Sequence, residues 1–192
     1  MKFKTILTVI LFGVAVFVCA KLAHAKTPTS KRAENAIARQ TPGLETELEA
    51  GGHEFGAPIF LRIVKTRDGT GRDGYLEAFI QNSQGEFKFF KRWDIFTWSG
   101  ALGPKLKEGD GQSPEGFYFI KPNSLNPNSN FHLSFNLGFP NTYDRAHGRT
   151  GSFLMVHGNC VSIGCYAMTD TGIEEIYTLV RAAFDGGQSI IR

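Results

Sequence analysis

The sequence predicts a mainly β fold, built from mixed sheets or a β-sandwich, with one clear α-helix near the C-terminal end. Short apolar segments, several of them alternating with polar residues, follow one another after residue 58, and turn-forming Gly, Pro, Asn and Asp separate them. The segment 172–184 instead spaces its apolar residues as one face of a helix. Because helices do not alternate with strands, the pattern argues against a doubly wound α/β fold.

The first 25 residues have the layout of a secretory signal peptide. The start is basic, an apolar run covers residues 5–20, and Ala23–Ala25 supplies the small residues of an A-x-A cleavage site. The apolar run is short for a membrane span, which needs about 20 residues. We therefore expect cleavage after Ala25 and export of a soluble chain without stable membrane insertion.

Cleavage changes the charge balance of the chain. The signal contains three lysines and no acids, so the 21 basic and 18 acidic residues of the full sequence become 18 of each. This balance gives no support to a nucleic-acid partner. Removing 25 of the 192 residues leaves a chain long enough for one domain with a real core.

Within the mature chain, residues 26–57 are expected to form a linker or N-terminal segment with a short helix near 32–39, and residues 58–192 to form the domain. The domain begins with three strand candidates that read as a β-meander: 59–65, 75–82 and 87–100.

The second half of the domain holds shorter elements. A glycine-rich connection covers 103–116 and a polar loop covers 141–151. Asp170 or Thr171 resembles the N-cap of the predicted helix, and two glycines follow its end. Three more strands are expected in this half, the last of which delivers His157 at its end: 116–120, 131–139 and 152–158.

The segment HGNCVSIGCYAM, residues 157–168, concentrates His157, Cys160 and Cys165. The His-x2-Cys-x4-Cys spacing matches no strong zinc pattern and lacks a fourth ligand, so no metal is expected. Two cysteines in an exported chain also invite a disulfide. That disulfide would leave His157 unused and would not explain Gly164 or Ser162.

A cysteine nucleophile uses more of the same segment. A thiol attacks as its thiolate, and His157 could take the proton from Cys165. Gly164 would let the chain turn so that the backbone N–H groups of Gly164 and Cys165 face the attacked carbonyl as an oxyanion hole. Residue chemistry alone leaves the nucleophile and the disulfide equally open.

The motifs of this segment resemble the active-site signature of the YkuD-type L,D-transpeptidases, which are bacterial cell-wall enzymes. The signature is His-Gly, a variable loop and Ser-x-Gly-Cys, found here as His157-Gly158 and Ser162-Ile163-Gly164-Cys165. SPEGFYFI, residues 113–120, resembles the upstream Pro-x-Gly-x-aromatic strand of the family. The likeness covers about residues 58–185 and is strongest to the YafK-type branch.

The resemblance implies a mainly β catalytic domain in the periplasm, with Cys165 as nucleophile, His157 as base, and the backbone N–H groups of Gly164 and Cys165 as oxyanion donors. It implies no cofactor, and it implies peptidoglycan stem peptides as substrate. Supporting or substrate-binding roles are expected for Gly158, Ser162 and Tyr166.

The chain departs from the family pattern at one position. Many members carry Arg two residues after the cysteine, where this chain has Ala167. Arg145 or Arg149 in the preceding loop is the expected replacement.

The expected reaction passes through a thioester with the carbonyl on the L-centre of meso-diaminopimelate. The resemblance to the YafK-type branch favours hydrolysis that releases a wall-bound lipoprotein. The alternatives are transpeptidation, which forms 3→3 crosslinks or attaches protein to the wall, and a non-catalytic wall-binding module with a Cys160–Cys165 disulfide.

Overall fold

The structure is a computed structural model that describes residues 27–66 and 74–192. The predicted signal peptide, residues 1–25, and most of the first predicted turn lie outside the described residues. Within the described ranges, no helix is both long and apolar enough to cross a membrane.

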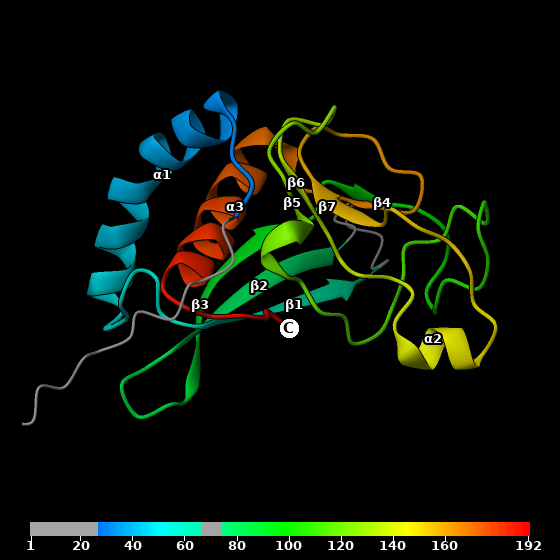
Figure 1. Cartoon of the computed structure of the whole chain (residues 1–192), viewed down its shortest axis with the longest axis horizontal. Helices are drawn as coiled ribbons and strands as arrows, with labels where there is room; N and C mark the ends of the chain where they lie inside the picture. The colour runs from blue at the N-terminus through cyan, green and yellow to red at the C-terminus, as the bar shows by residue number, and fades with distance from the viewer. Residues whose placement is uncertain (1–26, 67–73) are drawn as a thin grey trace, which may run out of the picture.

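The first sheet is the predicted antiparallel meander (Figure 1). It contains β1 (Ile59–Lys65), β2 (Gly74–Gln81) and β3 (Phe87–Asp94), in that order. The predicted strand 87–100 is divided, because β3 ends at Asp94 and β4 (Thr97–Trp98) joins the second sheet. This division lets one segment serve both sheets and brings them together around a shared core.

The second sheet is mixed and has the strand order β4-β8-β7-β6-β5. Its parallel pair, β7 and β8, carries the segment with the predicted nucleophile and base. The remaining strands of this sheet are short: β5 (Leu125–Asn126), β6 (Ser134–Asn136), β7 (Met155–His157) and β8 (Tyr166–Ala167).

Three of the predicted strands are shorter than expected, and β7 covers only three residues of the predicted strand 152–158. The segment 116–120 forms only a single bridge, between Ile120 and Ile191. Phe117 and Phe119 are exposed, so the apolar residues that suggested a strand in this segment do not form a buried strand. A 3-10 turn (Pro122–Ser124) follows this segment, and β6 covers three residues of the predicted strand 131–139.

The predicted C-terminal helix is present as α3 (Thr169–Asp185) and starts three residues earlier than expected. Its N-cap position is Met168, not Asp170 or Thr171. Ile173, Ile176 and Val180 are fully buried and form the apolar face of the helix. A further short helix, α2 (Thr142–Ala146), lies within the predicted polar loop.

Residues 31–50 form a long helix where the sequence favoured a linker with a short helix. This helix, α1 (Lys31–Ala50), is capped by the Ser30 side chain, which accepts from the N–H of Ala33. Its apolar residues are few, but they lie on one face and are buried in contact with α3 (Figure 1): Ala33, Ala36, Leu44 and Leu48. Pro42 within the helix and its polar composition explain why the sequence pattern understated it.

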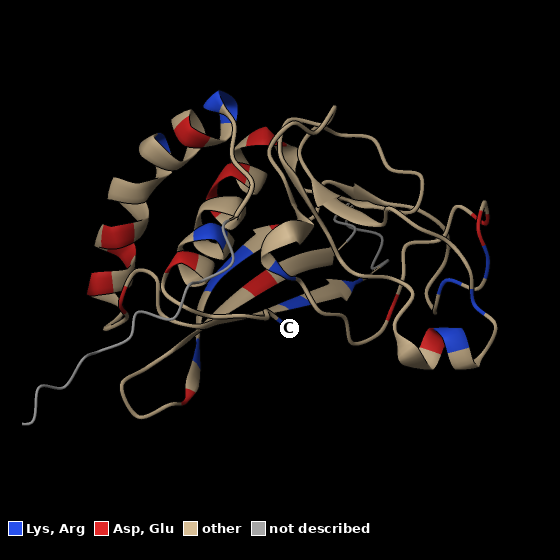
Figure 2. Cartoon of the chain, in the orientation of Figure 1, with Lys and Arg blue, Asp and Glu red and all other residues tan. Residues whose placement is uncertain are grey.

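Charged residues of both signs are interspersed along α1 and across β1–β3 (Figure 2). On the first sheet, Glu77 is buried between Arg62 and Arg92, with N–O distances of 2.6 Å to each guanidinium. Burial alone would raise the pKa of Glu77, but hydrogen bonds from both arginines lower it below its usual value. These arginines therefore hold a charged carboxylate on the sheet face opposite the core.

Replacing Leu48 tests whether α1 is part of the folded domain. Leu48 is 1% exposed, so Leu48→Ala should lower the free energy of unfolding by about 2–5 kcal/mol. Urea denaturation of the mature chain measures the change, with the exposed neighbour Glu49→Ala as control, expected within about 0.5 kcal/mol of the wild type. Equal stability of the two variants would mean that α1 does not pack on the domain.

Candidate active site

A short connection between the parallel strands β7 and β8 carries the predicted catalytic residues at its two ends. Val156 lies opposite Tyr166, and His157 lies opposite Ala167, in the parallel β7–β8 pair. Parallel neighbours are normally joined by a dozen or more residues, whereas residues 158–165 make this connection. The loop must therefore run back along β7 before β8 begins.

This return places Cys165 level with the start of β7. Met155 and Cys165 each precede a member of the Val156–Tyr166 pair by one residue, and the N–H of Met155 donates to Sγ of Cys165 at 3.4 Å. Since alternate residues of a strand share a face, His157 and Cys165 lie on the same face of the sheet. Ordinary strand spacing and rise put their Cα atoms about 8 Å apart. In the described structure no hydrogen bond joins Sγ of Cys165 to His157, and Sγ instead donates to the carbonyl oxygen of Phe153 at 3.7 Å.

Two positions of the loop, 158 and 164, require glycine for backbone or steric reasons. Gly164 has φ +102°, a region that residues with a side chain rarely adopt. A Cβ atom on Gly158 would lie 2.6 Å from Oδ1 of Asp170, at the start of α3. The same Asp170 oxygen accepts from the N–H of Asn159 at 2.8 Å, which anchors the loop to the helix. Gly158 and Gly164 are therefore needed to shape the turn.

The hydrogen bonding of His157 defines which of its nitrogens can act as a base. Its Nδ1 lies 2.5 Å from the carbonyl oxygen of Gly158. A carbonyl can only accept, so Nδ1 carries the proton in the neutral ring and Nε2 keeps its lone pair. The ring is buried, and this burial lowers the pKa of His157 below its usual value. His157 is thus held neutral and ready to accept a proton.

A second aromatic ring covers this imidazole. The Phe131 and His157 rings have centroids 4.8 Å apart and planes inclined by 32°. The next residue, His132, has φ +66° and its Nε2 lies 2.7 Å from Oε1 of Glu174 on α3. From α1, Arg39 reaches the same carboxylate oxygen at 2.6 Å.

Arg32 of α1 hydrogen-bonds to the backbone of the same loop, residues 129–132. Its Nη1 donates to the carbonyl oxygens of Ser129 and His132, at 2.9 Å each. Together with the Glu174 contacts, these bonds connect α1 and α3 to the loop that carries Phe131. The segment predicted as a linker therefore helps to hold the Phe131 ring against the His157 ring. His132 contributes its contact with Glu174 to this connection and does not lie on a strand.

The thiol of Cys165 is half-buried and in its neutral form. Burial raises its pKa, while the N–H of Met155 and the positive charge of Lys105 oppose that rise in part. A raised pKa means that little thiolate exists at neutral pH before a base acts. A nucleophilic role for Cys165, which stays a prediction, therefore requires a base that takes the thiol proton.

The two backbone N–H groups that the sequence assigns to the oxyanion hole both donate hydrogen bonds to serine hydroxyls. Cys165 N–H donates to Oγ of Ser162 at 3.1 Å, and Gly164 N–H donates to Oγ of Ser99 at 2.5 Å. Ser162 Oγ in turn donates to the carbonyl oxygen of Cys165 at 2.7 Å. An oxyanion role for these N–H groups stays a prediction, and it requires the hydroxyls to release them.

A hydroxyl across the sheet faces the same site. Ser134 on β6 lies directly opposite His157, so both side chains are on one face. Its Oγ is buried and has no hydrogen-bond partner among the residues that the structure describes. This hydroxyl therefore has unused hydrogen-bonding capacity next to His157. No sequence motif indicated it.

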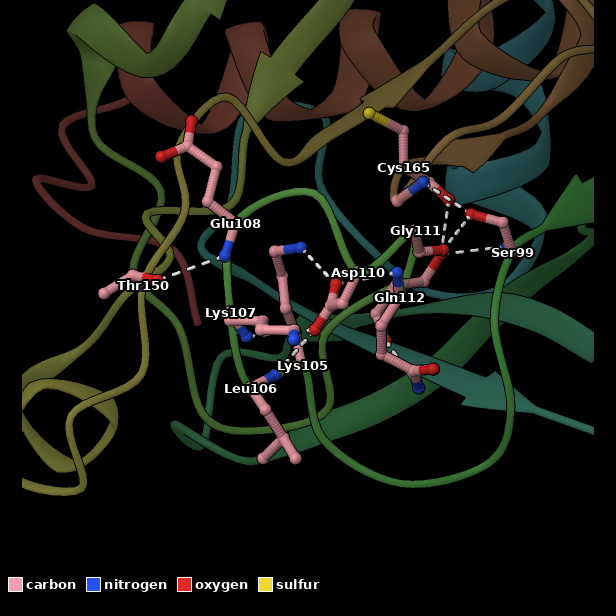
Figure 3. Close-up of polar contacts among 12 residues, drawn as sticks. Ser99, Lys105, Leu106, Lys107, Glu108, Asp110, Gly111, Gln112, Thr150 and Cys165 are labelled. Atoms are coloured by element: carbon pink, nitrogen blue, oxygen red, sulfur yellow. Dashed lines mark hydrogen bonds and ion pairs between the residues drawn. The ribbon is translucent and has the colours of Figure 1, made fainter.

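The loop 105–112 supports the catalytic turn from the other side (Figure 3). Asp110 organises the loop by accepting from the Lys105 ammonium at 2.5 Å and from the N–H groups of Leu106 and Lys107 at 3.0 Å each. The adjacent Gly111 carbonyl accepts from the Ser99 hydroxyl at 2.6 Å. Asp110 therefore holds the buried Lys105, and the neighbouring Gly111 holds the serine that contacts Gly164.

The arginines expected near the thiol have partners of their own. Arg149 pairs with Asp144 at 2.8 Å, and Arg145 donates to the carbonyl of Pro140. Neither forms a hydrogen bond or ion pair with Cys165 or His157 within the described structure. The cation that acts on the thiol is Lys105, which the sequence reading missed because its partner, Asp110, belongs to no recognised motif.

The other flanking residues have structural surroundings. Ala167, at the position of the family arginine, is fully buried between β4 and β7. The hydroxyl of Tyr166 donates to the Pro114 carbonyl at 2.6 Å, on the face away from the thiol. Cys160 is exposed, and both it and Cys165 are free thiols. No cluster of three or more metal-ligating side chains occurs in the described ranges.

Residues 78–186 match the YkuD family, the L,D-transpeptidase catalytic domain. The chain belongs to this family. The matched region contains the return loop, His157 and Cys165, whereas α1 and β1 precede it.

Curated relatives agree with this assignment, and a solved structure shares the fold. The chain is 42% identical over 138 residues to the protein named "Putative L,D-transpeptidase YafK" in Escherichia coli strains K12 and O157:H7, an alignment that covers 72% of this chain and 53% of each relative. The chain thus spans about half the length of these relatives. The helical cell shape determining protein Pgp2 from Campylobacter jejuni shares the fold, with TM-score 0.50 and 20% identity over 70% of this chain and 46% of Pgp2.

The alkylation rate of Cys165 should depend on pH as expected for a buried neutral thiol. Because burial raises its pKa, the rate with iodoacetamide should still be rising above about pH 9, where an ordinary thiol levels off. The measurement uses the Cys160→Ser variant, in which Cys165 is the single thiol of the mature chain. A plateau that begins below pH 7 would instead show a preformed thiolate–imidazolium pair.

Removing the aromatic cover should change the titration of His157. In Phe131→Ala, water reaches the ring, so the depressed pKa of His157 should rise toward its usual value of about 6.5. NMR titration of the His157 ring protons measures this shift. Phe119→Ala, at an exposed phenylalanine elsewhere, is the control. An unchanged pKa in Phe131→Ala would contradict a shielding role for Phe131.

Proposed function

We propose that this protein is a cysteine-dependent peptidoglycan enzyme that acts through a thioester on Cys165. The observation that carries the proposal is the placement of Cys165 and His157 on one sheet face, with Nε2 of His157 left unprotonated by the Nδ1 contact to Gly158. Membership of the L,D-transpeptidase family supports a wall-peptide substrate.

In the proposed reaction, Nε2 of His157 takes the Sγ proton and the thiolate attacks the carbonyl on the L-centre of meso-diaminopimelate. A carbon–sulfur bond forms and the carbonyl oxygen becomes an oxyanion. The carbon–nitrogen bond then breaks, and the leaving amine takes the proton from His157. A thioester on Cys165 and a neutral His157 remain.

The acceptor of the thioester decides between hydrolase and transferase. We propose water, activated by the neutral His157, so that the enzyme is an amidase that releases wall-bound lipoprotein. The buried Ala167, at the position where many family members carry an arginine, supports a different acceptor site from that of the transferases. Transpeptidation is the second candidate, and the name of the Escherichia coli relatives favours it.

The non-catalytic alternative has less support. A wall-binding module with an oxidised Cys160–Cys165 pair requires a disulfide, whereas both cysteines are free in the structure. The proposed location is the periplasm, reached through the predicted signal peptide. No cofactor is required by the proposed steps, because the thiol, the imidazole and the substrate account for every proton and bond.

Muropeptide analysis tests the proposal and separates its two versions. Sacculi that still carry bound lipoprotein are incubated with the mature wild type, Cys165→Ala and Cys160→Ala, and the products are identified by mass spectrometry. We expect free lipoprotein and unmodified tripeptide stems from the wild type, most of that activity from Cys160→Ala, and none from Cys165→Ala.

Two other outcomes would change the assignment. Cys165-dependent 3→3 dimers, or stems with newly attached amines, would show transfer to an amine in place of hydrolysis. Loss of activity in Cys160→Ala with retention in Cys165→Ala would contradict the choice of nucleophile.

A further inference from the structure

The backbone N–H of Met155 points at the thiol of Cys165. Met155 is the first residue of β7, the strand between β8 and β6 in the second sheet, and its N–H donates to Sγ of Cys165 at 3.4 Å. The same sulfur donates to the carbonyl oxygen of Phe153 at 3.7 Å. Sγ therefore lies between a backbone donor and a backbone acceptor of one short segment, residues 153–155.

The register of the sheet explains why this N–H is directed at the thiol. Positions 154 and 158 hydrogen-bond across to the segment that contains β6, and position 156 belongs to the same alternating set. Met155 falls between these positions, so its N–H faces away from β6 and toward β8. A regular parallel ladder would offer this N–H a backbone carbonyl, but β8 begins only at Tyr166, and the side chain of Cys165 accepts in its place.

The N–H of Met155 has a weak acceptor while the thiol is neutral. A thiol sulfur accepts hydrogen bonds poorly, whereas hydrogen bonds to a charged acceptor are short and strong. Loss of the thiol proton would therefore strengthen the contact with Met155 and make the contact with the Phe153 carbonyl repulsive. The N–H is held in the middle of a sheet, so it can stabilise the new charge without rearrangement.

The N–H groups of Gly164 and Cys165 are placed differently. They donate to the hydroxyls of Ser99 and Ser162. Each hydroxyl is fixed by its own donation to a carbonyl oxygen, from Ser99 to Gly111 at 2.6 Å and from Ser162 to Cys165 at 2.7 Å. Either N–H must lose its serine partner before it can bind an oxyanion, whereas the N–H of Met155 is already directed at the reacting sulfur.

The segment that presents this N–H has an unusual backbone conformation. Phe153 has φ +55°, a region that bulky side chains rarely adopt, and the residue is 73% exposed. Packing of its ring therefore does not explain the conformation. The turn at Phe153 leads the chain into β7 next to the thiol, and backbone strain that packing does not explain clusters at functional sites.

We propose that the backbone N–H of Met155 is a catalytic hydrogen-bond donor to the negative charge that forms at Cys165. When His157 takes the Sγ proton, the N–H stabilises the thiolate. The thiolate then forms the carbon–sulfur bond, and the π electron pair of the carbonyl moves to its oxygen, which lies next to the sulfur. The N–H stabilises this oxyanion until the carbon–nitrogen bond breaks. This inference rests on the proposed thioester chemistry.

Nuclear magnetic resonance of the intact protein tests the contact with the thiolate. Residues 26–192 contain two methionines, so labelling with 15N-methionine gives one amide signal each for Met155 and Met168. In the Cys160→Ser variant, the Met155 amide proton should move downfield as Cys165 ionises, because its hydrogen bond strengthens. The Met168 amide, which donates to the carbonyl of His157 at 2.8 Å, is the internal control and should move much less.

The same titration in Cys160→Ser/Cys165→Ser shows whether any shift comes from the thiol. Serine does not ionise in this range, so the Met155 signal should stay in place. A Met155 signal that does not move as Cys165 ionises, or that moves equally in the serine variant, would overturn the proposal.

An ester in place of the amide between Leu154 and Met155 removes the N–H and keeps every side chain. Cell-free translation with the 2-hydroxy acid analogue of methionine introduces it. The single-turnover rate of thioester formation with disaccharide-tetrapeptide should fall at least about a hundredfold, with the half-saturating substrate concentration unchanged. Alkylation of Cys165 by iodoacetamide at pH 8 should fall about threefold, because higher nucleophilicity partly offsets an about tenfold loss of thiolate.

Two variants control for damage to the sheet, and circular dichroism checks that each one folds. An ester at Val156 removes a bond to β6 and leaves the N–H of Met155 in place, and Met155→Ala removes only the side chain. Both should keep the wild-type rates. Wild-type rates in the Met155 ester would overturn the role of Met155 alone. Absence of a thioester on Cys165 in the wild type would overturn the proposed function, and the role of Met155 with it.

Discussion

The candidate site depends on one constraint of the backbone, the short return between the parallel strands β7 and β8. Eight residues, 158–165, bring the chain back so that Cys165 lies level with Met155 while His157 ends the neighbouring strand. Gly164 at φ +102° and the contact between Gly158 and Asp170 make the tight path possible.

The chemistry follows from how the turn is supported. Burial keeps both partners neutral, because it raises the pKa of the Cys165 thiol and lowers that of His157. The Gly158 carbonyl then selects the tautomer that can receive the thiol proton. Asp110 orders the loop 105–112, whose Gly111 carbonyl accepts from the Ser99 hydroxyl that contacts Gly164. Electrostatic and hydrogen-bonding support therefore comes from a loop that carries no catalytic group.

Local patterns predicted the parts of this structure that local interactions determine. The bounds of β1 and the helical face of α3 follow from apolar periodicity, and the His-Gly and Ser-x-Gly-Cys spacing identified the candidate pair. Lys105 and Asp110 could not be found in this way, because their relation to Cys165 exists only after distant segments fold together. The same holds for Arg39 on α1, which meets Glu174 across 135 positions of sequence. The polar composition of α1 and the presence of Pro42 explain why the sequence did not predict the full helix.

The central claim is that Cys165 carries the acyl group, and trapping that group tests it most directly. Wild-type protein in excess over purified disaccharide-tetrapeptide is quenched in acid within one turnover, digested, and mapped by mass spectrometry. The account predicts a stem-peptide thioester on the fragment that contains Cys165, and no such adduct on Cys160. An adduct on Cys160, or complete turnover with Cys165 unmodified at every quench time, would contradict it.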